Sequence, residues 1–283
     1  MSVVEPLLGT RVEIEVRARS AAAVERAEQA VIAEMQRLEA VFTVFDPSSA
    51  LNALVATGTT DVPELALVAD LAVDWRRRTS GLFEPAMQTV MRQWDAAEEV
   101  GTAPTDSELA AALVVLDEKA SADDLNAIAK GWIADRAAMT VVADPAVESV
   151  WVNAGGDVVH RGDGSVRVAV EDPRRPYDNA PPLAIVEIHD EALATSGGTR
   201  RFWTIGGRRY PKVLDPRTGR PVERLRSASV IAAEAVTADV LATVALVATV
   251  DETLSLMSDA DAACLLVTAE GEVVSTTDRF TAP

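Results

Sequence analysis

The segment SASVIAAEAVTADVLATVALVATV, residues 227–250, decides the fold class of this chain. Its first part reads as a strand, and after a short break the Val, Leu and Ala residues continue as a helix. We expect Thr237 to cap this helix, because a threonine hydroxyl can accept a hydrogen bond from a free backbone N–H of the first turn. A strand joined directly to a helix predicts a mixed α/β protein.

The rest of the chain adds helices and antiparallel strand pairs to this unit. Apolar residues indicate three further helices, at residues 20–45, 63–81 and 121–144. Ser20 is the expected cap of the first helix, and Ser121 with Asp124 forms a capping-box pattern before the third. Glycines at positions 206 and 271 indicate hairpins. No linker or repeat divides the chain, so we expect one mixed α/β (α+β) domain spanning residues 1–283.

The chain is strongly acidic, because 44 Asp and Glu residues against 26 Lys and Arg residues give a formal net charge of −18. A nucleic-acid partner is not expected, since binding to phosphates needs clustered cations. No apolar run is long enough to span a bilayer, and the N-terminal residues lack the basic and apolar regions of a secretory signal. We therefore expect a cytoplasmic protein without membrane insertion. The single cysteine, Cys264, is expected to be buried.

Asp239 and Thr243 are four residues apart, so both side chains lie on one face of the expected helix. One interpretation is structural: Asp239 interacts with the helix dipole, and Thr243 bonds back to a main-chain carbonyl. The other is a site for Mg²⁺, which prefers oxygen ligands and takes the remainder from water and substrate phosphate. The two residues alone leave both interpretations open.

Lys130 and Gly131 interrupt an otherwise regular helix, in which an interior glycine costs about 1 kcal/mol relative to alanine. Either close packing against another element or access of a ligand to the backbone would explain the glycine. Lys130 is either a phosphate-binding ammonium group or a surface lysine. Asp135 lies roughly on the same side of the helix, where a solvated charge is also reasonable.

Two glycine-containing turns are further candidates for ligand contact. NAGGD, residues 153–157, follows an apolar strand and lets the backbone approach a ligand, although its polar residues also suit an ordinary turn. ATSGG, residues 194–198, offers two hydroxyl groups and two glycines. This second segment suits either an anion-binding nest of N–H groups or a tight turn.

The order of these motifs resembles the ApbE family of Mg²⁺-dependent FAD:protein FMN transferases. The motifs are AKG-x-x-x-D, NAGGD, TSG, DP-x-TG and AD-x-x-x-T, at residues 129–135, 153–157, 195–197, 215–219 and 238–243. The resemblance covers nearly the whole chain. It implies an ApbE-like fold, with T-fold-like antiparallel sheets, packed helices and an FAD cleft between two lobes. The implied reaction attaches FMN from FAD through a phosphoester to a Thr or Ser of a target flavoprotein and releases AMP.

The resemblance also implies roles for individual residues. As metal ligands it implies the side chains of Asp239 and Thr243 and a main-chain carbonyl near Ala129. Lys212 and Asp215 are the implied catalytic residues, with Asp215 holding either the DP-x-TG loop or a polar group of the ligand. The implied FAD-binding positions are Phe45, Ser49, Leu51, Glu84, Lys130, Asp135, Gly155, Gly156, Asp157, Thr195, Ser196 and Gly197.

One position departs from the family pattern, since relatives commonly carry histidine where this chain has Lys212. A histidine near the transfer site is a plausible proton acceptor, whereas a lysine acts as a base only where burial or a neighbouring cation lowers its pKa. Lys212 can still stabilise phosphate charge. Two alternatives to transfer therefore stay open: hydrolysis of FAD to FMN and AMP, and FAD binding without catalysis.

Overall fold

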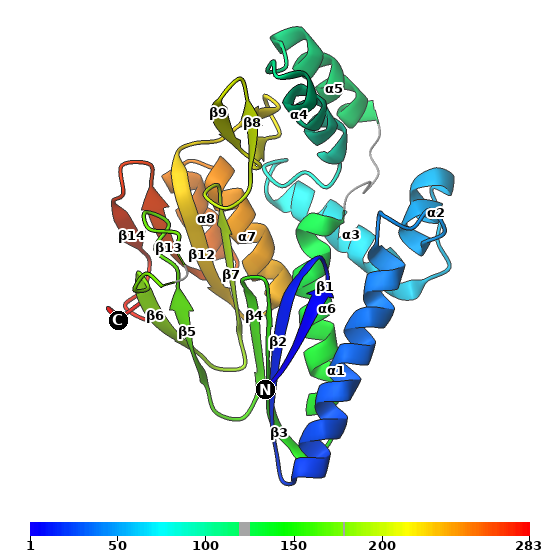
Figure 1. Cartoon of the computed structure of the whole chain (residues 1–283), viewed down its shortest axis with the longest axis vertical. Helices are drawn as coiled ribbons and strands as arrows, with labels where there is room; N and C mark the ends of the chain where they lie inside the picture. The colour runs from blue at the N-terminus through cyan, green and yellow to red at the C-terminus, as the bar shows by residue number, and fades with distance from the viewer. Residues whose placement is uncertain (119–124, 178) are drawn as a thin grey trace.

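An eight-stranded antiparallel sheet forms the centre of the computed structural model, which describes residues 1–118, 125–177 and 179–283. The strand order is β1-β2-β3-β4-β7-β12-β13-β14, so N-terminal strands form one edge and C-terminal strands the other (Figure 1). The bounds are β1 (Ser2–Leu7), β2 (Thr10–Ala18), β3 (Val147–Ala154), β4 (Asp157–Gly162), β7 (Ala192–Gly197), β12 (Leu225–Ala232), β13 (Ala263–Thr268) and β14 (Val273–Ser275). All neighbouring strands are antiparallel, which confirms the expected α+β class.

Short hairpins extend from this sheet. The predicted glycine turns at Gly206 and Gly271 are confirmed, because Gly206 lies between β8 (Phe202–Ile205) and β9 (Arg208–Pro211), and Gly271 lies between β13 and β14. Within the described residues, two-stranded sheets pair β5 (Val166–Val170) with β6 (Ala184–Ile188), β8 (Phe202–Ile205) with β9 (Arg208–Pro211), and β10 (Leu214–Asp215) with β11 (Arg220–Pro221).

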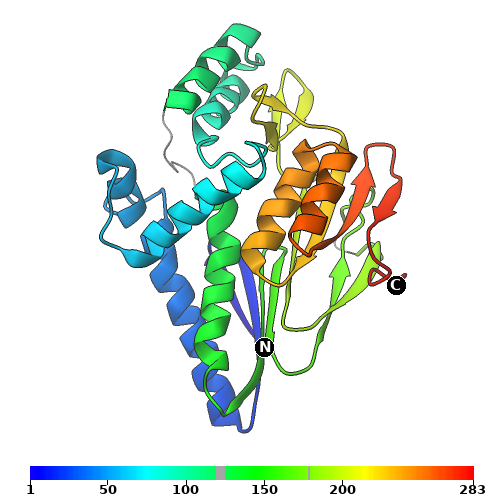
Figure 2. The ribbon, with the colours of Figure 1, turned by 180° about the vertical axis from the view of Figure 1, so that it is seen from behind.

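Helices cover one face of the large sheet (Figure 2). They are α1 (Ala21–Phe42), α6 (Asn126–Val142), α7 (Ala235–Val247) and α8 (Val250–Asp259), whereas α2 (Ala50–Thr57) packs on α1 and α3 (Pro63–Arg78) packs on α6. The central helices of this layer are α6, which packs on β3 and β4, and α7, which packs on β7 and β12. The main hydrophobic core lies between these helices and the sheet.

A second hydrophobic cluster lies beside the main core, at the top of Figure 1. It joins α4 (Gln88–Val100) and α5 (Asp106–Glu118), which the sequence pattern did not predict, to the β8–β9 hairpin. Trp94 and Trp203 stack within it with ring centroids 5.6 Å apart. Trp94 also donates a hydrogen bond to the carbonyl oxygen of Gly219, at 2.8 Å. This cluster therefore fixes the segment between β8 and β11 against α4.

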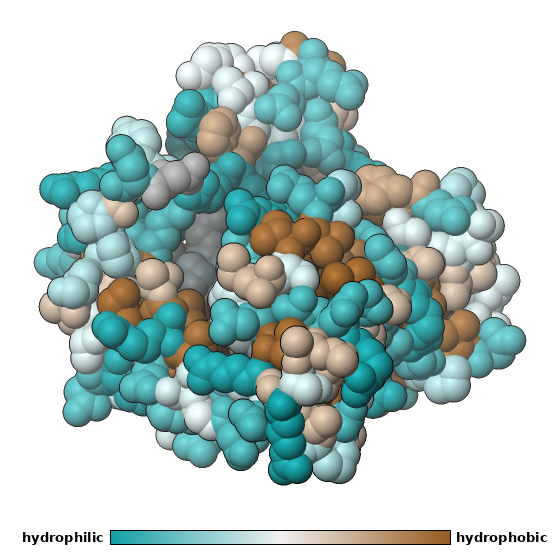
Figure 3. Space-filling view, turned by 60° about the horizontal axis from the view of Figure 1, so that its bottom comes forward, coloured by the Kyte–Doolittle hydropathy of each residue, from teal (hydrophilic) through white to brown (hydrophobic). Residues whose placement is uncertain are grey.

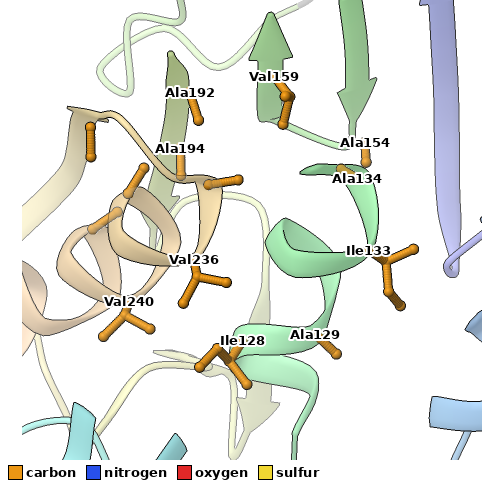
Figure 4. Packing of buried hydrophobic residues seen from close by; sticks show 14 of the residues in the cluster. Ile128, Ala129, Ile133, Ala134, Ala154, Val159, Ala192, Ala194, Val236 and Val240 are labelled. Carbon is orange, nitrogen blue, oxygen red and sulfur yellow. The ribbon is translucent and has the colours of Figure 1, made fainter. Parts of the chain in front are cut away.

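α6 and α7 approach each other closely at Gly131. A Cβ atom at this position would lie 3.0 Å from the main-chain oxygen of Ala235 and 3.3 Å from the Cβ atom of Asp239. Beside this contact, the side chains of Ile128 on α6 and Val236 on α7 lie near one another (Figure 4). Of the two explanations for the glycine, the structure supports close packing.

The start of α7 differs from the prediction. Thr237 is not the cap, because the helix already begins at Ala235 and the capping position is held by Glu234, which makes no side-chain capping bond. Instead the carboxylate of Asp135 on α6 accepts the N–H of Ala235, at 3.2 Å. A carboxylate from another helix thus satisfies a free backbone donor of α7.

The other predicted caps concern α1 and α6. Ser20 caps α1 as predicted, since its Oγ accepts the N–H of Ala23 at 3.2 Å. Ser121 and Asp124, the expected capping box before α6, lie outside the described residues.

Polar side chains make up most of one face of the surface (Figure 3). The face shown in Figure 3 is mostly hydrophilic, with apolar patches of limited size between the polar side chains. In the parts of the chain that the structure describes, no helix has both the length and the apolar character needed to cross a membrane.

Candidate active site

Lys130 and Asp157 form an ion pair where α6 meets the start of β4. The Lys130 Nζ donates to the Asp157 Oδ2 at 2.6 Å, and the Asp157 side chain is only 6% exposed. Burial lowers the pKa of the Lys130 ammonium, but the negative charges of Asp157 and Asp239 outweigh it, so that the pKa is raised overall. The ammonium group of Lys130 is therefore fixed in an ion pair and is not a freely solvated surface charge.

Asp239 is a buried carboxyl group beside this ion pair. Its Oδ2 has no hydrogen-bond partner among the described residues. Burial raises the pKa of Asp239 to about 8; the charge of Asp157 adds to the rise, while that of Lys130 opposes it. A buried carboxylate oxygen without a partner is unfavourable, so this atom suits a bound cation.

Thr243 lies one turn after Asp239 on α7, and its Oγ1 is 3.1 Å from the Oγ of Ser196 on β7. These hydroxyls, the Asp239 carboxylate and the main-chain carbonyl of Ala129 are all oxygen donors, which Mg²⁺ prefers. No group of three or more His, Cys, Asp or Glu side chains able to hold a metal occurs in residues 1–118, 125–177 and 179–283. A cation here would thus be held by one carboxylate together with hydroxyl, carbonyl and substrate oxygens, and this donor set fits Mg²⁺.

The NAGGD turn places Asp157 at the site. Gly155 and Gly156 both have positive φ, at +69° and +107°. A Cβ atom on Gly155 would lie 2.5 Å from the Thr10 Oγ1, so this turn also needs glycine for space. The N–H of Gly156 donates to the Asn153 side-chain oxygen at 3.1 Å. Contact of the two glycines with FAD stays a prediction.

The interpretation of the TSG segment as a tight turn or an anion-binding nest is wrong, because residues 195–197 form the end of strand β7 and pair with β12. Neighbouring residues of a strand point to opposite faces of the sheet, so the two hydroxyls have different partners. The Oγ1 of Thr195 is 2.8 Å from the Oγ of Ser229 on β12, whereas Ser196 contacts Thr243 on α7. A Cβ atom on Gly197 would lie 2.8 Å from the main-chain oxygen of Arg226. Of the predicted TSG residues, Ser196 is thus the one brought directly to the Asp239–Thr243 pair.

Asp135 has a clear structural role. Its two oxygens accept bonds from the Nε and Nη2 of Arg161 at 2.7 and 2.9 Å, in addition to the bond from Ala235 described above. Arg161, which the sequence pattern did not identify, is buried and also donates to the carbonyl of Ala233 at 2.8 Å. Asp135 therefore ties α6 to β4 and α7, and its contact with flavin stays a prediction.

The four candidates from the N-terminal third of the chain differ widely in exposure. Phe45 is 93% exposed, whereas Leu51 is fully buried in the main core. Ser49 is the side-chain cap of α2, and Glu84 pairs with the Nε of Arg76 at 2.5 Å. Contact with FAD stays a prediction for all four, and of them Phe45 alone presents a largely free side chain.

Lys212 follows β9 and reaches α4. Its Nζ is 3.5 Å from the Oδ1 of Asp95 and 5.0 Å from the ring centroid of Trp203. The same Asp95 oxygen accepts the indole N–H of Trp203 at 2.7 Å. Asp95 and Trp203 were not predicted, and no local signal identifies Asp95, because it is 117 positions from Lys212 in the sequence.

Asp215 holds the loop of residues 215–219 together. The Nε and Nη2 of Arg217 donate to its two oxygens at 2.9 and 2.7 Å, and the Arg217 main-chain N–H donates at 2.9 Å. Burial raises the pKa of Asp215, but these bonds to Arg217 outweigh it and lower the pKa overall. This geometry supports the loop-holding role, and direct contact of Asp215 with a ligand stays a prediction.

Two surface hollows lie away from this cluster. One of about 360 Å³ is lined by residues such as Ala50 and Thr59, and one of about 310 Å³ by residues such as Glu171 and Arg200. Lys130, Asp157 and Asp239 line neither hollow. The FAD cleft between two lobes therefore stays a prediction.

Solved structures share the arrangement of helices and antiparallel strands. The ApbE protein of Thermotoga maritima has a TM-score of 0.83 at 24% identity, covering 97% of this chain and 96% of its own. The flavinyl transferase ApbE of Pseudomonas stutzeri, in its apo form, has a TM-score of 0.80 at 23% identity, covering 100% and 98% of the two chains. The fold is thus that of the ApbE class of α+β proteins.

Sequence comparisons lead to the same class. Two curated relatives are both named FAD:protein FMN transferase. The one from Treponema pallidum is 28% identical over 274 residues, covering 83% of this chain and 75% of the relative. The one from Rhodobacter capsulatus is 30% identical over 257 residues, covering 82% of this chain and 48% of the relative. The family model described as ApbE family matches residues 8–266, and the chain belongs to this family.

Proposed function

We propose that this chain transfers the FMN portion of FAD to a Ser or Thr hydroxyl of a target flavoprotein, with Mg²⁺ as the metal, and releases AMP. Its family and the names of its curated relatives make it a flavin transferase. The observation that carries the chemistry is the buried Asp239 carboxyl group, whose Oδ2 is unpartnered among the described residues. It lies near the Lys130–Asp157 ion pair and one helical turn before Thr243.

Asp239, Thr243 and the main-chain carbonyl of Ala129 would hold the Mg²⁺. When bound, a Mg²⁺ ion neutralises charge on the diphosphate of the substrate. Coordination by Asp239 would supply the interaction that its buried Oδ2 lacks within the described residues. Lys130 adds a positive charge on the adjacent turn of α6, suited to phosphate oxygens.

In the proposed reaction the acceptor hydroxyl oxygen forms a bond to the phosphorus of the FMN phosphate. The bond from that phosphorus to the AMP oxygen breaks, AMP leaves with the bonding electron pair, and the hydroxyl proton passes to solvent. The residues of this chain bind and orient the diphosphate, because phosphoryl transfer depends mainly on positioning and charge stabilisation.

We place FAD between two lobes of the single domain, residues 1–283. One lobe is built on the large sheet and the other on α4, α5 and the β8–β9 hairpin, which have separate hydrophobic clusters. The flavin and its phosphate would then lie near Asp157 and the TSG segment, residues 195–197. A cytoplasmic location is part of the same proposal and is checked by cell fractionation.

A flavinylation assay tests this function. The purified chain is incubated with FAD and a flavoprotein that carries a Ser or Thr acceptor, with Mg²⁺ or with EDTA. We expect covalent flavin on the target and one AMP for each flavin attached, only when Mg²⁺ is present. Free FMN and AMP without labelled target would identify a hydrolase, and unchanged FAD would identify a binding protein; either result overturns the proposal.

A further inference from the structure

Asp95, Trp203 and Lys212 form a small cluster between α4 and the β8–β9 hairpin. One oxygen of Asp95 accepts the indole N–H of Trp203 at 2.7 Å and lies 3.5 Å from the Lys212 Nζ. The Lys212 Nζ also lies 5.0 Å from the Trp203 ring centroid. Among the described residues, Asp95 is the only carboxylate paired with Lys212. The lysine side chain is thus held by an anion and by an aromatic ring.

This cluster borders the TSG segment. A Cβ atom on Gly198 would lie 2.9 Å from the Cβ of Pro211, so the residue after TSG packs directly against the residue before Lys212. Two positions before Gly198, Ser196 contacts Thr243. The segment that reaches the expected metal ligands therefore also packs against Pro211, the residue before Lys212.

We propose that Asp95 is a positioning residue which, together with Trp203, holds Lys212 as an ammonium ion at the transfer site, where Lys212 acts as a fixed positive charge and not as a base. This inference rests on the proposed function. A carboxylate and the face of an indole ring both attract a cation. The ammonium stabilises negative charge on the phosphoryl oxygens during transfer, while the proton of the acceptor hydroxyl goes to solvent.

Glu98 provides a matched control, one turn along α4 from Asp95. Its Oε1 accepts the main-chain N–H of Thr204 at 2.6 Å, so it also ties α4 to β8. Glu98→Gln removes one negative charge from the same helix without changing the partners of Lys212. Asp95→Asn removes the charge that pairs with Lys212 but keeps an oxygen that can accept the Trp203 N–H.

The first experiment compares steady-state transfer by these variants with equilibrium FAD binding. We expect Asp95→Asn to lower kcat by about 10- to 100-fold, because a displaced Lys212 ammonium group no longer stabilises the negative charge of the transition state. The Kd for FAD should change little, Asp95→Glu should recover part of kcat, and Glu98→Gln should behave as wild type. Equal kcat values for Asp95→Asn and Glu98→Gln would overturn the inference.

The second experiment asks whether Lys212 takes a proton. An arginine keeps its charge at all relevant pH values and cannot act as a base. We expect Lys212→Arg to keep most of kcat and to follow the wild-type pH profile from about pH 6 to pH 9, because a fixed charge gives up no proton in the reaction. Lys212→Met should lose activity. An inactive Lys212→Arg variant, with wild-type kcat rising over this range, would identify Lys212 as the base and overturn the inference.

The two proposals fail in distinguishable ways. Wild-type protein that binds FAD but labels no target contradicts the proposed function itself. Wild-type protein that labels its target while Asp95→Asn matches Glu98→Gln contradicts only the role of Asp95. If Asp95→Asn does not fold, as judged by its melting temperature, the comparison of Lys212→Arg with Lys212→Met still decides whether Lys212 acts as a fixed charge.

Discussion

At the residue scale, the site depends on one carboxyl group, that of Asp239. Asp239→Asn keeps the shape of the side chain but removes the charge that a hard cation requires. We expect Mg²⁺-dependent transfer to fall by about 100-fold or more. The metal-free variant should be about as stable as metal-free wild type at pH 7, since a pKa of about 8 keeps the buried Asp239 mostly protonated, and the amide of the same shape is likewise neutral.

Mg²⁺ titrations of the transfer rate and of the melting temperature check the Asp239 prediction. The melting temperature of wild type should rise with Mg²⁺, because a ligand that binds only the folded state stabilises it, and that of the variant should not. Asp251→Asn, at the exposed start of α8, is the control and should keep both responses. Full Mg²⁺-dependent activity in Asp239→Asn would exclude Asp239 as a metal ligand.

Separation in the sequence determined which site residues could be predicted. Helical periodicity placed Asp239 and Thr243 on one face of a helix, and the resemblance to the ApbE family made them the expected metal ligands. Lys130 and Asp157 were found through motifs, but their ion pair joins residues 27 positions apart, so only the fold could show it. Asp95 had neither a motif nor a local pattern, since its contact with Lys212 exists only once α4 packs on the β8–β9 hairpin.

At the element scale, the contact between α6 and α7 holds Lys130 next to Asp239. Gly131→Ala would normally stabilise a helix by about 1 kcal/mol. Here the added methyl group would lie 3.0 Å from the main-chain oxygen of Ala235, which cannot turn aside as a flexible side chain can. We expect the clash to dominate and the free energy of unfolding to fall by about 1–3 kcal/mol.

Urea unfolding measures the effect of Gly131→Ala on stability, and Mg²⁺ titration measures its effect on the site. A shift of α7 would move Asp239 away from Lys130, so the affinity for Mg²⁺ should fall with the stability. Ala22→Gly at the exposed start of α1 is the control, which should lower stability by up to about 1 kcal/mol without changing Mg²⁺ affinity. If the free energy of unfolding of Gly131→Ala is unchanged or higher than that of wild type, α6 and α7 move apart without a loss of stability.

Helices and strands could be predicted from the sequence where a local apolar pattern defines them. The strand and helix of residues 227–250 were predicted correctly as β12 and α7, because their apolar pattern is local. The first residue of α7 was not predicted correctly. The backbone N–H of Ala235 donates to the carboxylate of Asp135, which lies 100 positions earlier in the sequence. α4 and α5 were missed as well, and their buried faces are completed by Trp203 and Leu214 from distant segments.

At the scale of the whole molecule, the C-terminal segment is tied back to the β5–β6 sheet. Arg279 donates to both oxygens of Glu191, at 2.9 and 2.5 Å, and to the carbonyl of Glu187 at 2.8 Å. Thr281 forms an isolated antiparallel β-bridge with Ile185 of β6. Burial raises the pKa of Glu191, but the bonds from Arg279 and from the His189 N–H outweigh it, so the pKa lies below its usual value of 4.5.

Because the folded-state pKa of Glu191 is lowered, the pair stabilises the protein above the unfolded pKa and stops doing so as the pH falls through the folded pKa. We expect Arg279→Gln to lower the free energy of unfolding at pH 7 by about 1 kcal/mol or less, since both side chains are partly exposed and screened. The difference from wild type should shrink as the pH falls below about 4. Urea unfolding of both proteins across this pH range measures it, with Arg77→Gln, on the exposed surface of α3, as control. A difference that stays constant into strong acid would show that Arg279 stabilises the segment through packing and its bond to the Glu187 carbonyl, independently of the Glu191 charge.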